Sequence, residues 1–307
     1  MVRLVSIDPA LLVHGDEKVR HRTWAQVLYS CGWHRGTVVA ENPNLRKLIS
    51  RVPDGTSSKE FQEFIIRIRQ KAQSMQVPGL EGDNWINRAL STSLMDYLLV
   101  EASENSGVEP RSINIDYYFD CLEEEHDSYS LRDPKFLKTL DLLIIGSMRI
   151  DLIDKYQPLF SLNPVFRHWL SVFTGTGIFQ RHLNRKPLLN IHVAHKDSDS
   201  ARLSILPGDT AHDLLNRMKA PDGSTGEELT HVFDVQFSIW EPKALHSRYV
   251  IGDIGGFHLG ESLNESGPVT VTRLTNHLGV RRDFDLKAES GGQFVRILKA
   301  YESEGLV

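Results

Sequence analysis

The stretch from residue 186 to residue 241 constrains the fold most, because it indicates a strand, a helix and a second strand in succession. "KPLLNIHVAH" (186–195) is a short apolar segment, and "THVFDVQFSIWE" (230–241) alternates apolar and polar residues. Such alternation is typical of a β-strand with one buried face. Between the two strands, "DTAHDLLNRMKA" (209–220) has the composition and spacing of a short helix. Strands that alternate with helices predict an α/β fold.

The first half of the chain is richer in predicted helix. "TSSKEFQEFIIRIRQKAQSM" (56–75) carries an apolar stripe at helical spacing, formed by Phe61, Phe64, Ile65, Ile68 and Ala72. Strands are predicted near residues 3–8 and 112–119, and further helices over 22–33, 84–103 and 290–307. The segment from 136 begins as a helix, and its apolar run "LLIIG" fits a buried helix or a buried strand equally.

These patterns predict a mixed α/β protein of two domains. A helix-rich α/β domain of unknown role is expected over residues 1–145, followed by a second α/β domain over 146–307. The chain has 307 residues, with 40% hydrophobic and 24% charged residues, which is ordinary for a globular protein. Its longest apolar runs are too short to span a bilayer, so no membrane span is expected.

Charge and cysteine usage give further expectations. The net charge of −5 gives no global attraction to nucleic acid, so a polyanion site would have to be a local patch. Cys31 and Cys121 lie in unrelated contexts and are expected to be free thiols in a reducing compartment. The start of the chain lacks the features of a signal peptide. A cytoplasmic protein is therefore expected.

The segment "LHSRYVIGDIGGFHLGESLNE" (245–265) carries the polar residues that most resemble a functional site. In an extended segment His246 and Arg248 lie on one face. An imidazole can act as a nucleophile, and a guanidinium can hold two phosphoryl oxygens. Asp253 follows the predicted strand, where its carboxylate could orient an imidazole. After a glycine turn, Ser262 and Asn264 offer neutral donors that suit an anion.

This spacing resembles the signature of the phospholipase D superfamily, in which His-x-Lys-x4-Asp is followed by Gly-Ser-x-Asn. The matching positions are, in chain order, His246, Arg248, Asp253, Gly260, Ser262 and Asn264. The resemblance covers roughly residues 180–270. It implies a phospholipase D-like domain in the second half of the chain.

The resemblance also assigns roles to the matching residues. His246 would be the nucleophile that forms a phosphohistidine, and Arg248 and Asn264 would bind phosphoryl oxygens. Asp253 would support the histidine, and Ser262 would contribute to phosphate binding. The family's active site uses two such motifs, and this chain carries one. A homodimer that brings two copies of His246 together is therefore expected, or a subunit of a complex whose site does not catalyse.

The sequence departs from the family's pattern in two places. Arg248 stands where the family has lysine, and Glu261 is inserted between the glycine and the serine. The hairpin is most similar in texture to the phospholipase D-like C-terminal domain of MIT-domain proteins, which are regarded as binding modules. Arginine is a poorer proton-transfer group but a good phosphate clamp. The substitution therefore weakens the expectation of hydrolysis more than that of phosphate binding.

Two functions follow as expectations. The first is a metal-independent phosphodiesterase, most simply a nuclease that acts as a homodimer, with a place in a prokaryotic antiviral defence system. The alternative is a catalytically degenerate module that binds phosphate groups or a partner protein. A basic island between residues 166 and 196 includes Arg181, Arg185 and Lys186 and favours nucleic acid as the ligand.

Metal chemistry is the remaining possibility. His192 and His195 are three apart on a predicted strand and therefore face opposite ways, so they do not predict a metal site. Four acids of the first half fit either a Mg²⁺ cluster or ordinary caps and turns: Asp8, Glu41, Asp96 and Asp116. No metal and no other cofactor is expected.

Overall fold

The chain forms two compact units, Met1–Glu125 (unit 1) and His126–Val307 (unit 2). The computed structural model describes residues 2–13, 15–40, 56–71, 97–100, 112–114, 127–130, 133–154, 167–168, 186–195, 205–219, 223–260 and 268–301. The sequence placed the boundary between the domains after residue 145, but the division between the units falls earlier, after Glu125. The difference arises because β5 (Asp127–Ser130) pairs with β11 of unit 2, and α6 (Pro134–Ile145) packs Phe136 against Phe257 of the same unit.

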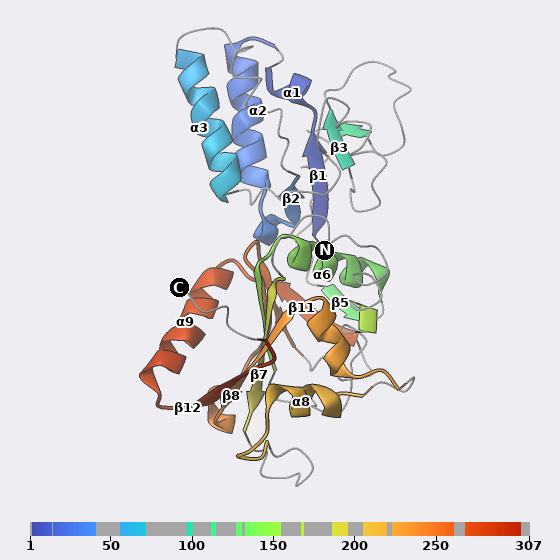
Figure 1. Ribbon diagram of the computed structural model, residues 1–307. Coiled ribbons are helices and arrows are strands. Elements are labelled where there is room, and N and C mark those ends of the chain that lie inside the picture. Colours follow the sequence, from blue (N-terminus) through green and yellow to red (C-terminus); the bar gives the residue numbers. More distant parts are fainter. Residues whose placement is uncertain are drawn as a thin grey trace. The chain divides into compact units, whose positions relative to one another are not determined.

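Unit 1 contains a four-stranded parallel sheet in the order β2-β1-β3-β4 (Figure 1). The elements are β1 (Arg3–Ile7), α1 (Pro9–Val13), α2 (Glu17–Ser30), β2 (Thr37–Val39), α3 (Thr56–Lys71), β3 (Tyr97–Val100) and β4 (Ser112–Asn114), with a 3₁₀ turn at Trp33–Arg35. The predicted stripe of α3 is buried from Phe61 to Ile68, and it packs with Trp24 of α2 and Val5 of β1. The core of unit 1 therefore lies between the two longer helices and the sheet.

Unit 2 contains an eight-stranded mixed sheet in the order β12-β8-β7-β6-β9-β10-β11-β5. After β5 and α6 its elements are β6 (Arg149–Ile153), β7 (Leu188–Ala194), α8 (Ala211–Arg217), β8 (Asp234–Trp240), β9 (Arg248–Ile251), β10 (Gly256–Leu259), β11 (Pro268–Arg273), α9 (His277–Ser290) and β12 (Phe294–Lys299), with 3₁₀ turns at Gly226–His231 and Pro242–Ala244. β6, β7 and β8 run parallel, and β9 is antiparallel to β6.

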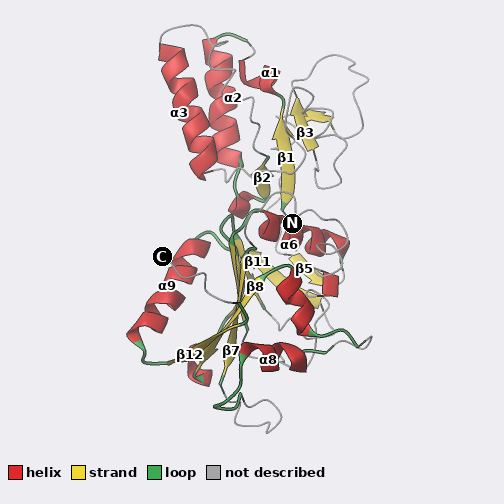
Figure 2. Ribbon diagram, viewed as in Figure 1, coloured by secondary structure: helices red, strands yellow, loops and turns green. Residues whose placement is uncertain are grey.

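Helices cover both faces of the unit 2 sheet (Figure 2). α9 lies on one face, and α6 and α8 lie on the other. β7 and β8 are interior strands of this sheet, and most side chains on both of their faces are buried. Within the described residues no helix has both the length and the apolar character that crossing a bilayer requires. The two units together confirm the expected mixed α/β class.

Two sequence predictions are wrong in the described residues. Tyr97–Val100 was expected within a helix but forms β3, which pairs with β1 and β4. The C-terminal helix prediction fails over Phe294–Lys299, which forms β12 at the edge of the unit 2 sheet. In both segments pairing with a neighbouring strand overrides the local helical preference. α9 itself had no counterpart in the sequence prediction.

Candidate functional site

The β9–β10 hairpin carries the predicted motif, and its register decides which motif residues meet. Arg248 pairs with Leu259 at one end of the hairpin, and Ile251 pairs with Gly256 at the other end. The first end therefore brings Arg248 beside Gly260, the first residue of the second half of the motif. Asp253 lies in the turn, at the opposite end of the hairpin.

Arg248 joins the two halves of the motif directly. Its Nη1 donates a hydrogen bond of 2.7 Å to the carbonyl oxygen of Gly260. Its Nε lies 3.6 Å from Oδ1 of Asp154, whose side chain is 1% exposed, whereas the Arg248 side chain is 23% exposed. A buried carboxylate and a backbone carbonyl therefore orient a guanidinium that still reaches the surface.

Asp154 and Arg248 lie at the carboxyl edge of the parallel strands of unit 2. β6, β7 and β8 all end at this edge, and β9 begins there because it runs antiparallel to β6. Asp154 directly follows β6, and His195 directly follows β7. The Nδ1 atom of His195 is buried and has no hydrogen-bond partner in the described part of the chain. In open α/β sheets ligands bind at the carboxyl ends of the strands.

His246 lies on this edge but not in a strand. It precedes β9 by two residues, in the short connection after the 3₁₀ turn, and it is exposed. The sequence predicts that His246 and Arg248 alternate along one strand. In the structure the strand begins at Arg248, so His246 lies outside it. An exposed imidazole next to an oriented guanidinium is the part of the predicted motif that this edge retains.

The resemblance implied that Asp253 orients His246, but the carboxylate of Asp253 has other partners. Its carboxylate accepts hydrogen bonds from the backbone N–H groups of Met148 (2.7 Å) and Arg149 (3.3 Å), and from Nη1 of Arg281 (2.5 Å). The strand rises about 3.3 Å per residue, so its ends at Arg248 and Ile251 are about 10 Å apart, and Asp253 lies beyond the second end. Asp253 instead fixes the start of β6 and the hairpin turn to α9.

The remaining predicted residues fall in two groups. Ser262, Asn264, Arg181 and Arg185 lie outside the described residues. Lys186 is exposed just before β7, and its Nζ donates to the carbonyl oxygen of Thr230 at 2.6 Å. That position is the amino end of β7, so Lys186 lies at the sheet edge opposite to Arg248.

A second polar group, which the sequence did not predict, lies buried beneath α9. Asp151 of β6 is 1% exposed, and its Oδ1 accepts hydrogen bonds from Asn190 (2.9 Å) and His192 (3.1 Å) of β7. The indole Nε1 of Trp240 donates to Nδ1 of His192 at 3.0 Å. An indole can only donate, so the proton of His192 is on Nε2, which therefore donates to Asp151.

Two arginines complete this network. Arg149 reaches Asp151 Oδ1 at 2.8 Å and Asp285 of α9 at 2.8 Å, and Arg281 Nε lies 2.8 Å from Asp151 Oδ2. Burial alone would raise the pKa of Asp151, but the hydrogen bond from His192 and the charges of both arginines outweigh it and hold that pKa below its ordinary value. Burial would lower the pKa of Arg149, but its bonds to Asp285 and Asp151 raise it.

The buried network contains the residue types of an acid–base site, but these residues are not accessible to a substrate. Both ring nitrogens of His192 are engaged, and the ring stacks on Trp240 with centroids 5.8 Å apart. His192 and Asp151 are sealed by Phe284 of α9, whose ring lies 5.5 Å from the imidazole. The network therefore holds α9 on the sheet. Its signal in the sequence was the polar residues at alternate positions of the apolar segments "RIDLI", "LLNIHVA" and "DVQFSIW".

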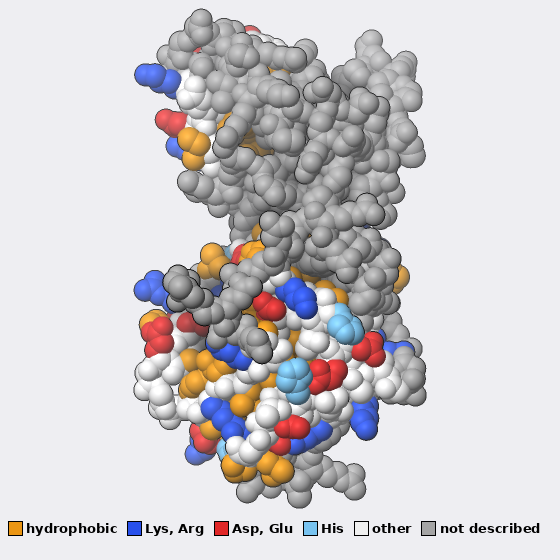
Figure 3. All heavy atoms as spheres, in the orientation of Figure 1, with side chains coloured by type: hydrophobic (Ala, Val, Ile, Leu, Met, Phe, Trp, Pro, Cys, Tyr) orange, Lys and Arg blue, Asp and Glu red, His pale blue; other side chains and the backbone are white. Residues whose placement is uncertain are grey.

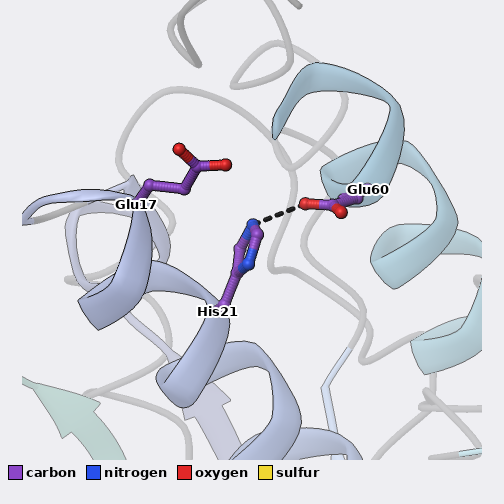
Figure 4. A group of neighbouring side chains, drawn as sticks. All are labelled: Glu17, His21 and Glu60. Carbon is purple, nitrogen blue, oxygen red and sulfur yellow. Dashed lines mark ion pairs between the residues drawn. The ribbon is translucent and has the colours of Figure 1, made fainter. Parts of the chain in front are cut away.

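Side chains that could hold a metal ion gather in unit 1. Within the described residues, one set of His, Cys, Asp and Glu side chains brings three ligand atoms together: Glu17, His21 and Glu60 (Figure 4). Of the acids that the sequence offered for Mg²⁺, only Asp8 lies in the described part of the chain. The sequence could have indicated Glu17 and His21 as neighbours, because they are four residues apart on one helix. It could not have indicated Glu60, which lies on another helix.

Comparison of the chain with protein-family models, with curated proteins and with solved structures finds no match. The resemblance to the phospholipase D superfamily therefore rests on the spacing of the hairpin residues alone.

Proposed function

We propose that unit 2 binds a phosphate group, within a nucleic-acid phosphodiester, at the carboxyl edge of its parallel strands. The observation that carries this proposal is the hydrogen bond from Arg248 to Gly260, which joins the two halves of the hairpin motif at that edge. Arginine suits the role because its planar guanidinium can contact two phosphate oxygens at once. Asp154 fixes the direction in which the guanidinium points.

The charge of the chain is consistent with a local site instead of a broad basic surface. The net charge is −5, and the face of unit 2 in Figure 3 shows basic and acidic side chains interspersed. Attraction to a polyanion then depends on a few oriented groups. Such a site is expected to make few phosphate contacts and to show a shallow dependence of affinity on salt.

Binding is favoured over cleavage by the position of Asp253. A nucleophilic imidazole needs a partner that orients it and accepts its proton, and Asp253 is held by Arg281 and by two backbone N–H groups at the far end of the hairpin. The exposed His246 beside Arg248 nevertheless supports a second candidate function, that of a phosphodiesterase. His246 would attack phosphorus and release an alcohol, and water would then hydrolyse the phosphohistidine.

The binding proposal is tested with a labelled oligonucleotide and fluorescence anisotropy at fixed salt. Arg248→Ala should weaken binding about tenfold or more, the loss expected for charge-assisted hydrogen bonds of about 1.5–3 kcal/mol. Arg248→Lys keeps the charge opposite Asp154 and should lose less. Arg282→Ala removes an exposed arginine of α9 and is the matched control. Equal affinities for Arg248→Ala and the control, with both proteins folded, would refute the proposal.

The cleavage candidate has its own readout. Wild-type protein is incubated with DNA or RNA in EDTA, because this chemistry needs no metal, and the products are separated by size. Activity that persists in EDTA, disappears in His246→Ala and rises with the square of protein concentration would support a homodimeric enzyme. Binding without cleavage, unchanged in His246→Ala, would leave unit 2 as a binding module.

A further inference from the structure

We propose that Glu17, His21 and Glu60 form a divalent metal site that clamps α2 to α3 in unit 1. The three side chains point toward one another from the two helices (Figure 4). One ligand atom from each lies within 4.8 Å of the others. The nitrogen and oxygen ligands of a tetrahedral Zn²⁺ ion lie about 2.0–2.2 Å from the metal, so they are about 3.4 Å from one another. To accept the ion, Nε2 of His21 and Oε2 of Glu60, now 2.5 Å apart, would separate by about 1 Å.

Helix geometry explains why these residues converge. Glu17 and His21 are four residues apart on α2, and residues at this spacing lie on the same face of a helix. Glu60 lies on α3, whose next residue, Phe61, is fully buried against α2. Packing of the two helices therefore brings Glu60 opposite His21 without any contribution from loops.

The imidazole of His21 packs against the aromatic core of unit 1. The ring of His21 lies 5.2 Å from that of Trp24, which in turn lies 5.1 Å from Phe61. The indole of Trp24 is fixed by a hydrogen bond of 2.8 Å to the carbonyl oxygen of Leu12. Ligands placed on packed helices hold their geometry, which is what a metal site requires.

The contact between His21 and Glu60 is not a satisfied hydrogen bond. Nε2 of His21 lies 2.5 Å from Oε2 of Glu60, which meets the distance for an ion pair. Both atoms are nevertheless buried and make no aligned hydrogen bond within the described residues. Two polar atoms that face each other without an aligned hydrogen bond are available to bind a cation placed between them.

Two basic side chains on these helices, Arg20 and Arg67, have partners outside this group. Arg20 donates from Nη1 to the carbonyl oxygen of Gly15 at 2.6 Å, and Arg67 pairs with Glu63 at 3.5 Å. Two carboxylates and one imidazole thus share a small volume, and the two carboxylates carry negative charge. A divalent cation would neutralise that charge.

The donor set selects the class of ion. One imidazole with two carboxylates suits Zn²⁺, Co²⁺ or Mn²⁺, whereas Mg²⁺ and Ca²⁺ prefer oxygen ligands alone. The described residues offer three ligands here, which leaves a fourth position on a tetrahedral ion for water. We therefore infer a Zn²⁺ site with one open coordination position.

The test uses the full chain, freed of any purification tag and of metal by EDTA and dialysis. Calorimetric titration with ZnCl₂ should show a site that saturates near one ion per chain, and Co²⁺ should give the visible absorption of a tetrahedral complex. Zn²⁺ should also raise the melting temperature, whereas Mg²⁺ should not. Thermal unfolding without metal reports whether each variant is folded.

Substitutions separate a metal site from a simple ion pair. His21→Ala and Glu60→Gln should each weaken Zn²⁺ binding at least about tenfold. Glu17→Gln should do the same, although this exposed residue contributes nothing to a His21–Glu60 pair. Glu63→Gln, one turn further along α3 and 65% exposed, is the matched control and should bind as the wild type does. Absence of Zn²⁺ binding, or unchanged binding in Glu17→Gln and His21→Ala, would overturn the proposal.

Discussion

Asp151 is the residue on which the interior of unit 2 depends most. It is almost fully buried, and its two oxygens face Arg149, Arg281, Asn190 and His192. A buried carboxylate is costly unless charges and hydrogen bonds satisfy it. Here two guanidinium groups and two neutral donors do so. Removing Asp151 would take away a carboxylate that Arg149 and Arg281 share, although each arginine also pairs with a second one, Asp285 and Asp253 respectively.

Asp151→Asn is therefore expected to destabilise the protein strongly. Removing one partner of a buried ion pair costs about 3–5 kcal/mol, because the charge left behind stays buried. Asp285→Asn also removes a carboxylate that binds Arg149, but Asp285 is 41% exposed, so its loss should cost less than about 1 kcal/mol. Urea denaturation of the two variants measures both values. Equal losses would contradict the central position of Asp151.

Residue roles in the hairpin show what sequence spacing can and cannot establish. The spacing identified Arg248 and the Gly260 segment as partners, and the antiparallel register does bring them together. It also assigned Asp253 to the support of His246, which the structure does not bear out. The spacing does not reveal the partners of Asp253, which in the structure are Arg281 and two backbone N–H groups.

At the scale of elements, α9 is the helix that organises unit 2. Phe284 inserts between the aromatic rings of Trp240 and Tyr249, with edge-on contacts at 5.7 Å and 6.5 Å. Arg281 donates to backbone carbonyl oxygens of both Arg149 and Ile251. His277, near the start of α9, is buried with its Nε2 3.2 Å from the carbonyl oxygen of Asp253. The helix is thus fixed to the sheet along its first two turns.

Docking of α9 is expected to weaken as pH falls. Burial lowers the pKa of His277 below its ordinary value of 6.5, and nearby Arg281 lowers it further, although Asp253 opposes both. At pH values above 6.5 the imidazole is neutral in the folded and the unfolded chain, so protonation of His277 does not reduce the free energy of unfolding. As pH falls through 6.5 the unfolded chain gains a proton that the folded chain resists, so stability is lost.

His277→Gln measures this contribution because it removes the titrating group and keeps a polar side chain. Wild type and variant are unfolded with urea at pH 7.5, 6.5 and 5.5. The free energy of unfolding should fall more steeply for the wild type, and the other histidines are common to both proteins. Parallel curves would mean that His277 does not couple protonation to stability.

Elements were predictable where a periodic pattern coincided with burial. The stripe of α3 and the alternation of β8 are buried as their patterns indicated. β12 was mistaken for a helix because the apolar residues Val295 and Ile297 are exposed at the edge of the sheet. Apolar and polar residues therefore do not alternate along this strand as they do where only one face is buried. α9 was missed because its charged sequence "RRDFDLKAES" buries few residues, one of them an arginine.

At the scale of the whole molecule, each unit has its own sheet and its own buried core. Unit 1 is built on four parallel strands, and unit 2 on eight mixed strands. The metal site proposed for unit 1 and the phosphate site proposed for unit 2 therefore depend on separate cores. Substitutions at one site are expected to leave the core that supports the other site unchanged.

The boundary between the units yields the sharpest test of this organisation. A fragment spanning residues 126–307 retains β5 and α6 and should unfold cooperatively with near-native secondary structure by circular dichroism. A fragment that starts at residue 146, where the sequence alone placed the boundary, lacks α6. The apolar side chains of α6 that would be lost include Phe136, Leu140, Leu142, Leu143 and Ile144, all at most 2% exposed.

Loss of α6 uncovers the face of the sheet on which it packs. Phe257 loses its ring contact with Phe136, and β11 loses the strand that follows it at the sheet edge, since β5 is also removed. An uncovered apolar face and an open strand edge promote aggregation. The shorter fragment should therefore bind a hydrophobic dye and elute as aggregates in gel filtration, while the longer one elutes as a compact species. If both fragments fold equally well, α6 is not part of the core of unit 2.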